Sequence, residues 1–119
     1  MSSPAPESRE QIADAVVRCI DAKDLRKALA ICQRLNQQHA DYAYGWYLAS
    51  FLMQKVRHYP DAIRAIDQAL QLASLDKYQL HKIRCHFEAN DLAGAIAAAA
   101  VLKDKSFVDP LLHSQLGSL

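Results

Sequence analysis

Three residues with metal-binding or catalytic side chains lie on one predicted helical face. His81, Cys85 and Glu88 are spaced by four and three residues, so they would point the same way from successive turns of a helix. Imidazole, thiolate and carboxylate groups at this spacing could supply two or three ligands to a metal ion. A tetrahedral site needs a fourth ligand and usually a set of supporting hydrogen bonds. Because this spacing supplies neither, we expect no metal site and no cofactor.

The cysteines are not arranged as catalytic nucleophiles. Cys19 and Cys32 fall on apolar stripes, where a cysteine behaves as a small hydrophobic residue. The sequence contains no glycine-rich phosphate loop, no GxSxG motif and no HExxH motif. We therefore expect these residues to have no catalytic activity, so the chain is predicted not to be an enzyme.

The overall charge is nearly balanced. Fourteen lysines and arginines stand against thirteen aspartates and glutamates, which leaves a formal charge of +1 at pH 7. A chain without a strong basic field lacks the electrostatic attraction that concentrates nucleic acid or anionic lipid. We therefore expect neither a nucleic acid nor a membrane as the partner.

The cysteine count and the N-terminal residues bear on the compartment. Three cysteines without a close CxxC pair predict neither a disulfide framework nor a zinc knuckle. Residues 1–7 lack the basic start and apolar run of a secretory signal, and no stretch approaches the roughly 18 apolar residues of a membrane span. We predict a soluble, cytoplasmic protein.

Composition and periodicity predict helices. Glycine and proline are rare, and good helix formers fill most positions between residues 8 and 105. Apolar residues recur at three- and four-residue steps in blocks of about four turns. Seven helical segments are predicted, and their start signals are Ser8 with Gln11 as a capping box, Asp24, Asp41, Pro60 in a first turn, Ser74, Asn90, and Asp109 with Pro110.

These segments repeat along the chain. Similar residues recur 34 positions apart in the first two copies, as in Ala28 and Ala62 or Leu29 and Ile63. The third copy follows if one residue is deleted in its internal turn, because Trp46 aligns with Leu80 at 34 residues, whereas Ala62 aligns with Ala95 at 33. Ala28, Ala62 and Ala95 are predicted where the two helices of each copy cross, since larger side chains would separate the helix axes.

The repeat resembles the tetratricopeptide repeat, a 34-residue helix–turn–helix unit with the pattern W-x2-L-G-x2-Y, then A-x3-F, then P. The second copy carries the resemblance through Trp46, Ala49, Ser50, Met53, Tyr59, Ala62, Ile66 and Ala69. Ser50 stands where a glycine is usual, and no proline closes the first two copies. The resemblance implies an all-α fold, a right-handed superhelix of antiparallel helix pairs. It divides the chain into a disordered N-terminus (1–8), repeats at 9–42, 43–76 and 77–109, and a truncated fourth repeat (110–119).

In this family the first helix of each pair lines a concave groove that binds a peptide or protein. Carried over to this chain, the resemblance implies a partner-binding groove made of Tyr44, Tyr47, Phe51, Lys55, Tyr78, His81, Lys82 and Cys85. The simpler alternative for Phe51 is that it packs against Val17. Some members bind acidic chaperone tails through a clamp of lysine, asparagine and arginine, and only Lys82 fits that pattern here.

The predicted function is a non-catalytic scaffold for protein–protein interaction. A rival from another class is that these repeats are the N-terminal appendage of a larger bacterial enzyme, such as a sulfotransferase or a glycosyltransferase. A third is a structural spacer. The fourth repeat appears cut short, which predicts a homo-oligomer formed through the C-terminal end. The alanine-rich run at 93–102 is either a contact with another subunit or simply an outer helix with few polar residues.

Overall fold

The protein is helical throughout the part of the chain that the structure describes. The computed structural model describes residues 8–108, with side chains through residue 102, and contains no strand in that range. Its helices are α1 (Arg9–Asp21), α2 (Leu25–Gln38), α3 (Ala43–Lys55), α4 (Tyr59–Leu72), α5 (Asp76–Glu88) and α6 (Leu92–Val108). This arrangement confirms the predicted all-α helical repeat. The seventh predicted segment, which begins at Asp109, lies outside the described residues.

Three of the predicted start signals are confirmed. The Ser8 side chain accepts a hydrogen bond from the backbone N–H of Gln11, and the Gln11 side chain accepts one from the backbone N–H of Ser8. This reciprocal pair is the capping box predicted for α1. Asp24 accepts from the N–H of Lys27 at the start of α2, and Pro60 lies in the first turn of α4.

The other three starts lie one residue later than predicted. The predicted caps were Asp41, Ser74 and Asn90. The residues found there are Tyr42 before α3, Leu75 before α5 and Asp91 before α6. Tyr42 and Leu75 make no side-chain cap bond, and their backbone carbonyls accept the first hydrogen bonds of the two helices instead. The nearby polar residues Asp41 and Ser74 therefore did not predict the first residues of α3 and α5 correctly.

Each helix pair is closed by a turn of the same length. Residues 22–24, 56–58 and 89–91 separate the two helices of successive pairs. The middle residue of each turn has a left-handed backbone, with φ of 64° at Lys23, 64° at Arg57 and 65° at Asn90. A left-handed residue at this position is the usual way for a helix to end and the chain to reverse. The deletion predicted in the internal turn of the third repeat is therefore wrong.

The one-residue deletion lies instead in the link between the second and third helix pairs. Four residues, 39–42, connect α2 to α3, whereas three residues, 73–75, connect α4 to α5. As a result α5 begins 33 residues after α3, and not 34. One residue turns a helix by about 100°, so the change alters which face of α5 lies beside α3. The counterparts of Tyr44, Tyr47 and Phe51 are Lys77, Leu80 and Arg84.

Two apolar clusters hold the pairs together. The first joins α1, α2 and α3 through fully buried side chains such as Ile12, Cys32 and Leu52. The second joins α3, α4 and α5 around Ile66 and Tyr78. Each of α2 and α4 therefore packs against the first helix of its own pair and against the first helix of the next pair, as stacked repeats require.

The helices of a pair cross at small residues. Ala28 and Ala62 are 0% exposed and Ala95 is 8% exposed, which confirms the burial predicted for all three alanines. In the second pair the Ser50 hydroxyl donates a hydrogen bond of 2.6 Å to the carbonyl oxygen of Ala62. Such a bond between α3 and α4 requires the two backbones to be close together, and it explains how serine is accommodated at a position where glycine is usual.

Trp46 has a structural role. Its ring packs against the second cluster. Its indole N–H donates a hydrogen bond of 2.9 Å to the carbonyl oxygen of Ala40, in the link between α2 and α3. The tryptophan therefore ties the link between the first two pairs to the core.

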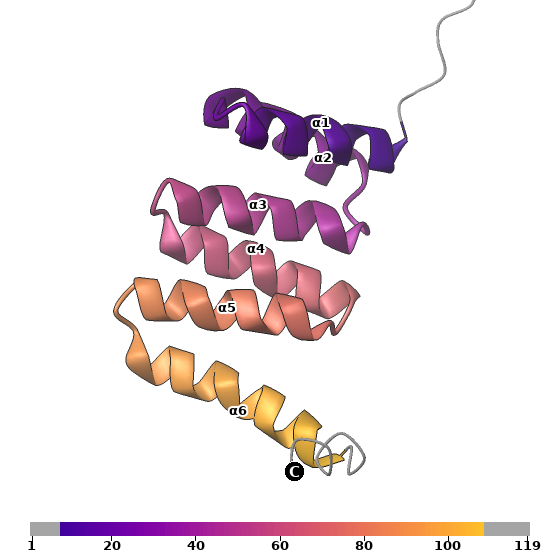
Figure 1. The fold of residues 1–119 in the computed structure, drawn as a ribbon. Helices are drawn as coiled ribbons and strands as arrows, with labels where there is room; N and C mark the ends of the chain where they lie inside the picture. The colour runs from indigo at the N-terminus through magenta and orange to yellow at the C-terminus, as the bar shows by residue number, and fades with distance from the viewer. Residues whose placement is uncertain (1–7, 109–119) are drawn as a thin grey trace, which may run out of the picture.

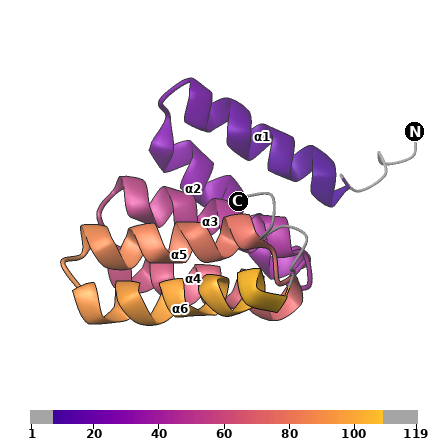
Figure 2. The same ribbon diagram turned by 60° about the horizontal axis from the view of Figure 1, so that its bottom comes forward.

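The pairs follow one another along an elongated molecule of 61 × 31 × 24 Å. Figure 1 shows the helices in chain order along its length, and Figure 2, turned by 60°, again shows α1 and α6 at opposite ends. The first helices of the pairs, α1, α3 and α5, are neighbours in space, since α1 contacts α3 and α3 contacts α5. Side chains from all three pairs can therefore form one surface.

Candidate binding surface on the first helices of the pairs

One surface runs across α1, α3 and α5. Its residues form one continuous surface because they line the same depressions or because their aromatic rings stack on one another. We call it the first-helix face, and it consists of Val17, Ile20 and Asp21 of α1, Tyr44, Tyr47, Phe51 and Lys55 of α3, and Lys77, Leu80 and Arg84 of α5.

Aromatic rings form the centre of this face. The rings of Tyr44 and Tyr47 stack with their centroids 6.0 Å apart, and Tyr47 stacks on Tyr78 at 5.1 Å. The ammonium group of Lys77 lies 5.6–5.7 Å from the centroids of all three rings, within the range of a cation–π interaction. These mutual contacts hold the tyrosines in place, so a partner that bound them would lose little side-chain freedom in doing so.

The aromatic rings separate two depressions. A depression of about 230 Å³ lies between α1 and α3, where Val17, Ile20 and Leu48 surround an apolar space beside Phe51. A depression of about 130 Å³ lies between α3 and α5 and is lined by Lys77, Leu80, His81 and Arg84. Tyr47 lines both of them. The two depressions therefore lie on either side of one tyrosine.

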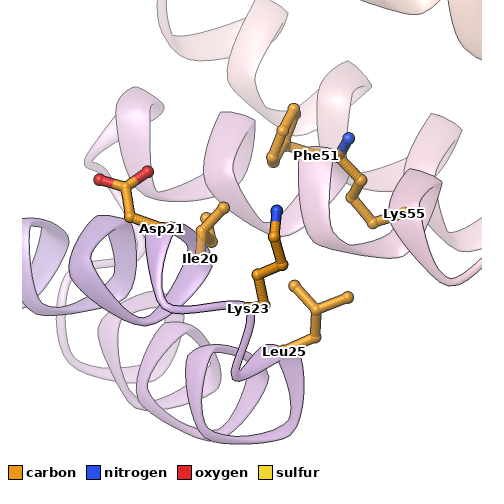
Figure 3. Close-up of a pocket in the computed structure, with 6 residues that line it drawn as sticks. All are labelled: Ile20, Asp21, Lys23, Leu25, Phe51 and Lys55. Atoms are coloured by element: carbon orange, nitrogen blue, oxygen red, sulfur yellow. The ribbon is translucent and has the colours of Figure 1, made fainter.

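A third and larger depression of about 410 Å³ lies at the far end of α1 and α3. Figure 3 shows that the side chain of Lys23, in the turn between α1 and α2, extends toward Phe51 and Lys55 of α3. Ile20 and Leu25 supply apolar lining. With two lysines and one aspartate around an apolar lining, this depression can bind an apolar group whose polar end accepts hydrogen bonds.

Four of the predicted site residues lie on the first-helix face. Tyr44, Tyr47 and Phe51 are half-buried, and Lys55 is exposed. The ammonium group of Lys55 lies 5.1 Å from the centroid of the Phe51 ring. Phe51 also lines the apolar depression together with Val17, so both side chains border the same open space between α1 and α3. Packing of Phe51 against Val17 stays a prediction.

Three other predicted site residues are enclosed. Tyr78 is 3% exposed, His81 is 8% and Cys85 is 0%. Tyr78, predicted as a residue of an open groove, is instead enclosed, because the 33-residue spacing turns these side chains toward α3 and α4. Burial raises the pKa of Tyr78 above its usual value and raises that of the Cys85 thiol to about 11.

His81 and Cys85 form a polar cluster with Ser50 inside the protein. The Nε2 atom of His81 lies 3.0 Å from the Ser50 hydroxyl oxygen and 3.5 Å from the Cys85 sulfur. Because Ser50 donates its own proton to Ala62, it accepts one from Nε2, so the imidazole carries a proton on Nε2. Burial lowers the pKa of His81. The cysteine is therefore a protonated thiol beside a neutral imidazole, without the thiolate that nucleophilic chemistry needs.

The eighth predicted residue, Lys82, points toward α4. Its ammonium group forms an ion pair of 2.7 Å with Asp67. Glu88, the third member of the spacing considered for metal binding, instead accepts a hydrogen bond from the Gln54 side chain at 3.0 Å. Among residues 8–102, no group of three histidine, cysteine, aspartate or glutamate side chains lies close enough together to hold a metal ion.

Sequence reasoning missed Lys77, Leu80 and Arg84. All three are exposed, Leu80 at 56%, and all three line the depression between α3 and α5. A signal was present in the turns: residues 22–25 read Ala-Lys-Asp-Leu and residues 89–92 read Ala-Asn-Asp-Leu. The match indicates that the first and third internal turns have equal lengths, so the deletion lies in another part of the third repeat. With the deletion before α5, these three residues align with the α3 residues of the first-helix face.

The same fold occurs in a bacterial secretion chaperone. The chain superposes on SycD, the type III secretion translocator chaperone of Yersinia enterocolitica, in a structure described as an alternative dimer, with a TM-score of 0.78. The match covers 93% of this chain and 85% of SycD. With 13% sequence identity, the likeness concerns the fold alone.

The sequence comparisons add no relative. No family model matches the sequence, and no curated protein matches it. Within residues 8–108, the structure contains no helix with the length and apolar character needed to cross a membrane.

Proposed function

We propose that this chain is a non-catalytic protein-binding module of the tetratricopeptide-repeat type, and that its partner binds the first-helix face. One observation carries the proposal: three helices from three successive pairs contribute to one surface, on which two depressions share Tyr47. Tyrosine and arginine are the residues that most often dominate protein interfaces, because each combines a large contact area with hydrogen-bonding groups. Tyr44, Tyr47 and Arg84 supply both types here.

The solved neighbour agrees with this proposal. SycD is named a translocator chaperone, and a chaperone acts by binding another protein. The enclosed side chain of His81 is used in the chain's own packing, through its hydrogen bond to Ser50. The exposed groups of the first-helix face, among them Lys55, Leu80 and Arg84, remain available to a partner.

Selection of peptides from a random displayed library would test the proposal. Selected peptides should bind the wild-type chain, and both Tyr47→Ala and Phe51→Ala should weaken them about tenfold or more, since a central aromatic contact contributes roughly 1–2 kcal/mol or more. Tyr59→Ala is the matched control, because Tyr59 is a half-buried tyrosine on α4 outside the face. Helix content and melting temperature would confirm that each variant folds.

Two results would contradict the proposal. Either no peptide is enriched, or the enriched peptides bind Tyr47→Ala and Phe51→Ala as tightly as the wild type. In the second case the chain still binds proteins, but through another surface.

A second surface favours self-association. Ile66 of α4 is 0% exposed because α5 covers it, whereas its counterpart on α6, Ala99, is exposed. The α6 residues Leu92 and Ile96 are 58% and 70% exposed. We propose that a second copy of this chain packs against α6, where a run of alanines permits close approach of another helix. The dimer described for SycD agrees with this proposal.

A further inference from the structure

Charged side chains of opposite sign border the first-helix face on α1 and on α5. Asp14 and Asp21 are exposed on α1, and Lys77 and Arg84 are exposed on α5. Each pair is seven residues apart, so its members lie on one side of their helix, two turns from each other. Asp21 lines the depression between α1 and α3, and the carboxylate of Asp14 is near enough to Tyr44 to help raise the pKa of that tyrosine. Burial is the larger cause of that rise.

These border charges lack ion-pair partners, whereas one lysine of α5 and one arginine of α1 have them. Lys82 of α5 pairs with Asp67, and Arg9 of α1 pairs with Glu10. In the described part of the chain, no ion pair includes Asp14, Asp21, Lys77 or Arg84. The chain therefore presents two negative charges without ion-pair partners on α1 and two positive charges without ion-pair partners on α5, and Lys23 and Lys55 line the depression beside Asp21.

The two depressions differ in the kind of side chain that they can accept. The one between α1 and α3 is mainly apolar, with Val17, Ile20 and Phe51, and it can accept an aliphatic or aromatic side chain. The one between α3 and α5 has Lys77 and Arg84 at its edge, and these groups bind a carboxylate through charge-assisted hydrogen bonds. His81 also lines it, and burial favours the neutral form of its ring by lowering its pKa, so the positive charge there comes from Lys77 and Arg84.

Helix spacing sets the distance between the groups that would fill these depressions. Packed helices lie about 8–10 Å apart. An extended segment in the polyproline II conformation advances about 3.1 Å per residue with three residues per turn, so its side chains three residues apart point to the same side. Such a segment, crossing Tyr47 at right angles to the helices, therefore places side chains three residues apart into the two depressions. Its remaining end passes over α1, where Asp14 and Asp21 attract a positive charge.

We propose that the partner of the first-helix face is an extended segment that carries a basic side chain over α1, an apolar side chain in the depression beside Phe51, and an acidic side chain about three residues further on, between Lys77 and Arg84. The inference rests on the proposed binding function and adds the partner's charge order to it. The segment can run in either direction across the face, because the proposal fixes only which type of side chain lies over each helix.

Synthetic peptides of one length with a common apolar centre would test the charge order. Four versions carry basic and acidic ends, two acidic ends, two basic ends or neutral ends, and the first is made in both sequence directions. We expect the mixed-charge peptide, in at least one of its two directions, to bind at least fivefold more tightly in fluorescence anisotropy than the peptides with two acidic, two basic or neutral ends. The advantage should shrink as salt is added, because the charges that produce it are exposed.

A charge reversal on α5 provides a sharper test. In the double variant Lys77→Glu, Arg84→Glu, both borders become acidic, so the preference should move to the peptide with two basic ends. The matched control is Arg26→Glu, Lys27→Glu on α2, which makes the same change in net charge at two exposed positions outside the face. The control should keep the wild-type preference.

The outcomes separate this inference from the proposed function. If library-selected peptides bind the face but none of the synthetic peptides bind, or if the peptides with ends of one charge or with neutral ends bind as tightly as the mixed one, the charge order is wrong and the binding face stands. If the α5 reversal leaves the preference unchanged, the charge order is also wrong. If no peptide binds by any route, both are wrong.

Discussion

The Nε2 atom of His81 lies 3.0 Å from the hydroxyl oxygen of Ser50, which in turn lies 2.6 Å from the carbonyl oxygen of Ala62. This chain of two hydrogen bonds connects α5 to α3 and α3 to α4, so it joins the third helix pair to both helices of the second. A buried polar group with its partners in place favours one arrangement of the helices, because any other arrangement would leave it without a hydrogen bond.

His81 predicts how stability depends on pH. Its pKa is lowered by burial, so the unfolded chain binds a proton more readily than the folded one. The stabilising effect of the neutral imidazole is complete above the unfolded pKa of about 6.5 and is lost as the pH falls below it toward the lower folded value. In urea unfolding at about pH 5 and pH 7.5, the wild type should lose more stability on acidification than His81→Gln. An equal loss in both proteins would show that this histidine is not responsible.

Overpacking at Ala62 should destabilise the protein. Ala62 is 0% exposed, and its carbonyl oxygen is bonded to Ser50 across the crossing of α3 and α4. Ala62→Leu should lower the free energy of unfolding by about 1–3 kcal/mol, because the larger side chain pushes the helices apart. The matched change Ala30→Leu, at an exposed position of α2, should have an effect within about 0.5 kcal/mol. Equal melting curves for the two variants would show that the crossing is not tightly packed.

The three cysteines should differ in their reactivity. Burial raises the pKa of Cys32 to about 12 and that of Cys85 to about 11, and both side chains are enclosed. Cys19 is only half-buried. Iodoacetamide at about pH 8 should therefore alkylate Cys19 first and reach the other two only after denaturant is added, since the thiolate is the reactive species. Early labelling of Cys85 in the native protein, detected by peptide mass spectrometry, would contradict its enclosed position.

Self-association should depend on the exposed face of α6. Ile96→Lys places a charge at the position that is 70% exposed and should weaken dimer formation about tenfold or more, because a buried charge without a partner is costly in an apolar interface. Gln33→Lys is the control, since it adds the same charge at an exposed position of α2. Sedimentation velocity over a range of concentrations would measure both. A wild-type chain that stays monomeric throughout that range would refute the proposed contact.

Local sequence signals located most of the helices. The capping box at Ser8 and the cap at Asp24 specify helix starts through hydrogen bonds within three residues, and Pro60 favours a first turn through its fixed φ and its missing N–H. All three are confirmed. Asp41 and Ser74 failed as signals because α3 and α5 start without a side-chain cap. At these starts the packing of Tyr78 and other core residues compensates for a missing local signal.

By itself the sequence determined the all-helical repeat, the small residues at the helix crossings and the aromatic centre on α3, because those features depend on local propensity and on the spacing of apolar residues within one helix. The tertiary structure alone decided which side of α5 lies beside α3. A one-residue difference in the link before α5 changes the sequence alignment very little, yet it changes the α5 counterpart of each α3 residue to a neighbour that points about 100° away. The stacking of α5 on α3 and α4 encloses Tyr78, His81 and Cys85 and leaves Lys77, Leu80 and Arg84 at the surface. The charge order of the binding face is therefore a consequence of how the helix pairs stack.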